Sequence, residues 1–65
     1  MLWLSELILE RHEIVSFKEL EIAVAEKAKQ TGEMFFRMDI KPTYLDTPEN
    51  WEDKLEASFT SAQQR

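Results

Sequence analysis

Few side chains in this chain of 65 residues could act as a nucleophile or a base, because it has one histidine, His12, and no cysteine. A Ser-His-Asp arrangement would have to combine His12 with Ser5 or Ser16. Ser16 fits better as a helix cap. Ser5 precedes His12 in the same predicted helix, and the helix rise separates them by roughly 10 Å, too far for a hydrogen bond. We therefore expect no enzyme, and interpret His12 as a surface histidine near a helix C-terminus.

Carboxylates occur at helical spacing in two places, and each set could bind a hard cation weakly. Neither set has the loop of a dedicated calcium site, and no Glu-x-x-His motif of a di-iron bundle is present. One glycine cannot form a phosphate-binding loop. We expect solvated helix faces, with no metal site and no cofactor. The two sets are Glu6, Glu10 and Glu13, and Glu49, Asp53 and Glu56.

The composition is 43% hydrophobic and 32% charged, which is typical of a globular, helix-rich protein. The net charge of −5 and the scattered basic residues argue against binding to nucleic acid or to an anionic membrane. The opening MLWLSELIL lacks the basic start of a signal peptide, and no apolar run is long enough to cross a membrane. We expect a cytoplasmic protein.

Two helices are predicted in the first half of the chain. Residues 2–12 place Leu4, Leu7 and Ile8 on one face. A capping box at Ser16 and Glu19, with Val15 and Leu20 as a hydrophobic staple, begins a second helix over residues 17–30. Gly32 is placed to end it in the left-handed conformation. The apolar face of this helix is Phe17, Leu20, Val24 and Ala28.

The run EMFFRMDIKP, residues 33–42, alternates as a half-buried strand does. Its apolar face is Met34, Phe36, Met38 and Ile40. Thr47 as a cap and Pro48 as the first helical residue then predict a third helix over residues 48–59. This helix places Trp51, Leu55 and Phe59 on one stripe. We expect one domain, residues 1–62, and a frayed polar tail, residues 63–65.

The predicted fold is α+β and mostly helical, in the order helix, helix, strand, helix. A lone strand leaves its backbone groups unpaired, so we expect it to pair with its own copy across a homodimer. The first alternative is that residues 2–9 form a strand, giving a βαβα chain in which two strands pair through a right-handed crossover. An all-helical chain is the second alternative.

Seven residues are candidates for contact with another protein. Aromatic and arginine side chains outside an apolar face are typical interface anchors. Acidic residues on the third helix and its approach could bind a basic partner. The candidates are Trp3, Phe35, Arg37, Glu49, Glu52, Asp53 and Glu56.

The favoured hypothesis is a small regulatory interaction protein, a homodimer that presents an acidic helical surface to a protein partner. Phage and plasmid accessory proteins are often short acidic chains of this kind. The alternative is an antitoxin-like or accessory subunit whose strand completes the sheet of a partner.

The run ILERHEIVSFKELEIAV, residues 8–24, resembles the first two helices of winged-helix regulators. No activity or residue role is carried over from this resemblance, and a weak DNA-binding regulator is the third hypothesis. A turn and a strand follow where a recognition helix should stand, and the acidic charge disfavours nucleic acid.

Overall fold

The computed structural model describes residues 1–63, whose elements follow the order strand, helix, helix, strand, helix. The chain is α+β and mostly helical, as the sequence predicts. Because α3 includes Gln63, that residue is helical rather than part of a tail. The rest of the predicted tail, residues 64 and 65, lies outside the described residues. The elements are β1 Leu2–Trp3, α1 Leu4–Glu10, α2 Phe17–Thr31, β2 Phe36–Arg37 and α3 Trp51–Gln63.

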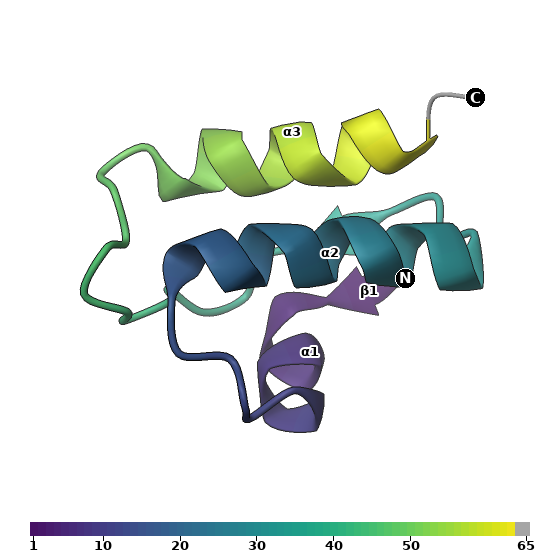
Figure 1. Cartoon of the computed structure of the whole chain (residues 1–65). Coiled ribbons are helices and arrows are strands. Elements are labelled where there is room, and N and C mark those ends of the chain that lie inside the picture. The colour runs from purple at the N-terminus through teal and green to yellow at the C-terminus, as the bar shows by residue number, and fades with distance from the viewer. Residues whose placement is uncertain (64–65) are drawn as a thin grey trace.

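Helices α2 and α3 lie side by side and run in the same direction, with the strands behind α2 (Figure 1). The strands are parallel, with Leu2 opposite Phe36 and Trp3 opposite Arg37. The Leu2 N–H donates to the Phe35 carbonyl at 2.8 Å. The strand predicted from the sequence thus has a partner within its own chain, so the expectation of a lone strand is wrong and no longer argues for a dimer.

Helix α1 begins at Leu4, two residues after the predicted start at residue 2. Strand β2 is shorter than the strand predicted over residues 33–42. Near the start of α1 and the end of β2 lies the carboxylate of Asp39. It accepts hydrogen bonds from the Ser5 N–H at 3.1 Å and the Ser5 hydroxyl at 2.6 Å. This contact satisfies an N–H of the first turn of α1, and Asp39 itself comes two residues after Arg37, where the ladder ends. The strand alternative for residues 2–9 is therefore correct for Leu2 and Trp3 alone.

The predicted helix over residues 17–30 is confirmed. The Glu19 N–H donates to the Ser16 hydroxyl at 3.1 Å. The Glu19 carboxylate accepts from the Val15 N–H at 2.9 Å, one residue earlier than expected. Gly32 ends the helix with φ of 67°, in the left-handed region. The predicted staple is wrong, because the Val15 side chain is 75% exposed, while the neighbouring Ile14 is buried.

The third helix begins at Trp51, and its predicted start at Thr47 and Pro48 is wrong. The Asn50 carbonyl accepts the hydrogen bond of the Lys54 N–H, and the Thr47 N–H donates instead to the Tyr44 carbonyl in a turn. The predicted stripe is confirmed: Leu55 and Phe59 are buried, and Trp51 packs against the core.

The core lies between the helix pair, α1 and the inner face of the sheet. Its fully buried side chains are Leu4, Leu7, Leu20, Val24 and Leu55. Complete burial of each leucine stabilises the fold by about 1.5–3 kcal/mol. Phe36 extends the core from the sheet by stacking on Phe59, with 5.2 Å between ring centroids.

The predicted apolar face of the second strand is only partly buried. Phe36 and Met38 pack against the core, whereas Met34 and Ile40 are exposed. The regular ladder ends at Arg37, so the alternation of a strand does not continue to Ile40.

Candidate interaction surface

The sheet has one covered face and one bare face. Leu2 and Phe36 stand opposite each other and point into the core. Trp3 and Arg37, the next pair in the register, therefore point outward, as side chains alternate along a strand. Met1 lies two residues before Trp3, and Phe35 lies two residues before Arg37, so both are on the same outward side. We call the outward group, with the adjoining Met34, the sheet surface: Met1, Trp3, Met34, Phe35 and Arg37.

Large apolar side chains of the sheet surface are open to solvent. The exposed fractions are 55% for Met1, 74% for Met34 and 66% for Phe35. No element among residues 1–63 covers them. Single exposed apolar residues are ordinary, but a contiguous group of them is typical of an interaction site.

Trp3 and Arg37 hold each other in place on the sheet surface. The guanidinium carbon of Arg37 lies 5.6 Å from the centroid of the Trp3 ring. This distance is within the range of a cation–π interaction. The contact fixes the direction of the arginine, and its N–H groups remain available to a carboxylate.

A hollow of about 330 Å³ joins the sheet surface to α3. Phe35 and Arg37 line it on the strand side, and Glu56 and Thr60 line it on the helix side. Among residues 1–63, Arg37 and Glu56 form no ion pair with each other or with another residue. The rim of the apolar patch therefore carries two opposite charges that residues 1–63 do not pair.

The structure brings four of the seven predicted residues together and leaves three apart. Trp3, Phe35 and Arg37 form the sheet surface, and Glu56 borders its hollow. Glu49 precedes α3, and Glu52 and Asp53 lie in its first turn. These last three are exposed and make no ion pair within residues 1–63.

Two carboxylates that the sequence reasoning missed hold the connection between β2 and α3. Asp39 caps α1, and Asp46 accepts hydrogen bonds from the N–H groups of Phe17 at 2.7 Å and Lys18 at 3.3 Å. The hydrogen bond from the Ser5 side chain holds the pKa of Asp39 below its ordinary value. The bond from the Phe17 N–H does the same for the pKa of Asp46. Neither aspartate has a local signal, since its partners lie 34 and 29 residues away.

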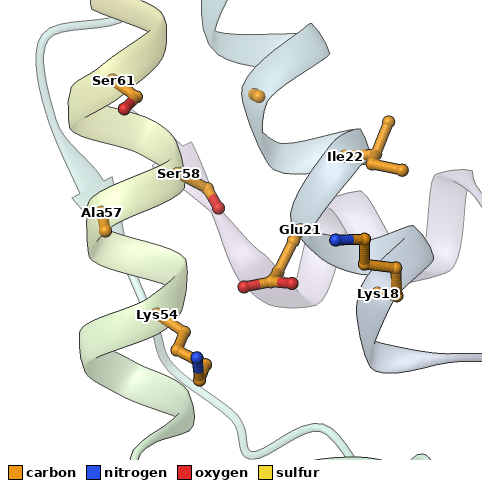
Figure 2. Close-up of a pocket in the computed structure, with 8 residues that line it drawn as sticks. Lys18, Glu21, Ile22, Lys54, Ala57, Ser58 and Ser61 are labelled. Carbon is orange, nitrogen blue, oxygen red and sulfur yellow. The ribbon is translucent and has the colours of Figure 1, made fainter.

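A second hollow, of about 460 Å³, lies between α2 and α3 on the side away from the strands (Figure 2). None of the predicted interaction residues lines it. We call it the helix groove. It is lined by Lys18, Glu21, Ile22 and Ala25 of α2 and by Lys54, Ala57, Ser58 and Ser61 of α3.

The side chains considered for catalysis are hydrogen-bonded to other residues or exposed to solvent. The Ser5 hydroxyl donates to Asp39, and His12 is exposed in the turn after α1. Within residues 1–63, no three histidine, aspartate or glutamate side chains gather as a metal site would need. None of the helices described here has the length and apolar character to cross a membrane.

Comparisons of the chain with models of known protein families, with curated proteins and with solved structures found no match. Function is therefore inferred from the geometry of the sheet surface and of the two hollows.

Proposed function

We propose that this protein is a small non-enzymatic interaction protein that acts as a homodimer, and that its two copies meet through the sheet surface. The observation that carries the proposal is the bare outer face of the sheet, where Met1, Met34 and Phe35 are more than half exposed. A second copy would remove this apolar area from water, which favours association in proportion to the area buried.

The charges on the rim of the sheet surface support a second copy as the occupant. A two-fold interface must be complementary to itself. Arg37 and Glu56 have opposite charges and line the same hollow. In the proposed dimer, Arg37 of each copy lies against Glu56 of the other. Each pair then brings together two charges that have no ion-pair partner among residues 1–63 of one copy.

The length of the chain supports the same arrangement. A chain of 65 residues buries only about 60% of the surface that its unfolded form exposes. Here the sheet is packed on one face only, so a dimer would complete the second face. Glu49, Glu52 and Asp53 lie outside the proposed interface and stay free for the basic protein partner expected from the sequence.

Sedimentation equilibrium tests the proposal with two matched variants. Phe35→Ser removes an exposed aromatic side chain from the sheet surface, and Ile22→Ser removes an exposed apolar side chain, 50% exposed, from the helix groove. Loss of an aromatic anchor at an interface costs about 2 kcal/mol, and a two-fold dimer loses one anchor from each copy, so we expect the dimer of Phe35→Ser to dissociate on the order of a thousandfold more readily.

The Ile22→Ser variant should dissociate as the wild type does. A wild-type chain that stays monomeric over roughly a hundredfold range of concentration would overturn the proposal. Equal weakening by both variants would also contradict it, because the interface would then not be confined to the sheet surface.

A further inference from the structure

The shape of the helix groove fits a third helix. Beyond Lys54, its α3 wall is formed by the small side chains Ala57, Ser58 and Ser61, and Ser58 points into the space between the helices (Figure 2). Small side chains let another backbone approach closely, and the ridge of an incoming helix can fill the space above them. Ile22 adds a half-exposed apolar side chain on the α2 wall.

The lining of the groove carries two lysines and one glutamate, a small excess of positive charge, although the protein as a whole is acidic. Lys18 and Lys54 line one end, and Lys29, one turn beyond Ala25, lies toward the other. Glu21 is the one acidic side chain in the lining. Within residues 1–63, none of these three lysines makes an ion pair, whereas Lys27 pairs with Glu10. The net charge of the whole chain is −5, so this strip has the opposite sign to the protein as a whole.

The common direction of α2 and α3 favours one orientation of a third helix in the groove. Helices α2 and α3 are parallel, so the positive poles of their dipoles lie together at the end that carries Lys18 and Lys54. A third helix gains most when its negative C-terminal pole lies over that end. It then runs opposite to both α2 and α3.

From this shape and charge we infer that the helix groove binds an acidic amphipathic helix of a partner protein, antiparallel to α2 and α3. A second copy of this chain is disfavoured as the occupant, since two grooves face to face would bring lysines against lysines. The inference does not depend on the proposed dimer, because the strands lie behind the helix pair (Figure 2) and no residue lines both the helix groove and the hollow beside the sheet surface.

Two designed peptides provide the probe. Each is a helix of about 16 residues with blocked ends and one stripe of alanine and leucine. The remaining positions carry glutamate in the first peptide and lysine in the second. Titration is followed through the backbone amide NMR signals of the protein. We expect the glutamate peptide to shift the signals of Ala25, Ala57 and Ser61, with an affinity at least tenfold higher than that of the lysine peptide, as expected for desolvated charge pairs.

Three variants locate the binding site. Ala57→Leu fills the groove from an exposed position and should abolish the shifts, with the fold retained. Lys54→Glu should weaken the glutamate peptide several-fold, while Lys41→Glu, an exposed lysine outside the groove, should change its affinity little. Equal affinity for the two peptides, shifts confined to the sheet surface, or equal effects of Lys54→Glu and Lys41→Glu would each overturn the inference. Sedimentation of the same variants reports on the dimer separately, so either proposal can fail alone.

Discussion

The sheet surface and the helix groove are two open regions of this molecule, and they differ in both shape and charge. The sheet surface projects large side chains, Met34 and Phe35 among them, and carries the opposite charges of Arg37 and Glu56 at its rim. The helix groove is hollow, lined largely by small side chains, and edged by lysines. A surface with both signs of charge can match its own copy, whereas a surface with one dominant sign repels its copy and selects a partner of the other sign.

The largest expected effect separates the core side of α2 from its groove side. Leu20 is fully buried, and Ile22, two residues along, is half-exposed in the groove. Leu20→Ala should lower the free energy of unfolding by about 2–5 kcal/mol, and Ile22→Ala by less than about 1 kcal/mol. Urea unfolding at one protein concentration measures both. Similar losses for the two variants would mean that α2 does not face the core as described.

Acid should destabilise the fold through Asp39 and Asp46, which hold the connection that follows β2 against α1 and the start of α2. Their folded pKa values lie below those of the unfolded chain. Their contribution to stability is therefore complete above the unfolded pKa, about 3.9, and is lost as the pH falls through the lower folded values. Once the pH is below about 4, the melting temperature of the wild type should decrease, and that of Asp46→Asn should decrease less. A wild type and variant with parallel pH profiles would exclude Asp46 from this role.

Salt should weaken peptide binding in the groove several-fold more than it weakens the dimer. Raising the salt from about 0.1 M to about 1 M shortens the range of charge interactions from about 10 Å to about 3 Å. Binding of the glutamate peptide in the groove should weaken several-fold, because it depends on lysines. The dimer should weaken less, because the sheet surface is mainly apolar. A dimer more sensitive to salt than the peptide complex would reverse the assignment of the two regions.

The smallest effect is expected from acidic residues away from both regions. Glu52→Lys with Asp53→Lys should leave the dimer unchanged, because both residues lie outside the sheet surface, and should lower the melting temperature slightly, because cations replace anions at the positive pole of α3. Sedimentation and thermal unfolding of the double variant give the comparison. A strong shift toward monomer would extend the interface to the first turn of α3.

Features governed by neighbouring residues could be predicted from the sequence. Ser16 and Glu19 begin α2, and Gly32 ends it, because each acts within one turn of its own position. The buried stripes of α2 and α3 also follow from spacing alone, since a helix repeats its faces every 3.6 residues. Trp3, Phe35 and Arg37 could be selected as surface anchors because they fall outside the predicted apolar faces.

Features governed by distant residues could not be predicted in this way. The start of α1 is reinforced by Asp39, and the start of α2 is reinforced by Asp46. The pairing of β1 with β2 involves only two residues on each strand, too few to give a periodic signal. The helix groove also has no signature in the sequence, because it exists only where the exposed sides of α2 and α3 meet.

The most direct test of the central claim is sedimentation equilibrium of charge-reversed variants of the sheet surface. Arg37→Glu alone and Glu56→Arg alone each place like charges across the proposed interface, and we expect both to shift the chain toward monomer. The double variant restores opposite charges, and we expect it to recover the dimer. Single variants that dimerise as the wild type does, or a double variant no better than the single ones, would contradict a dimer formed through this surface.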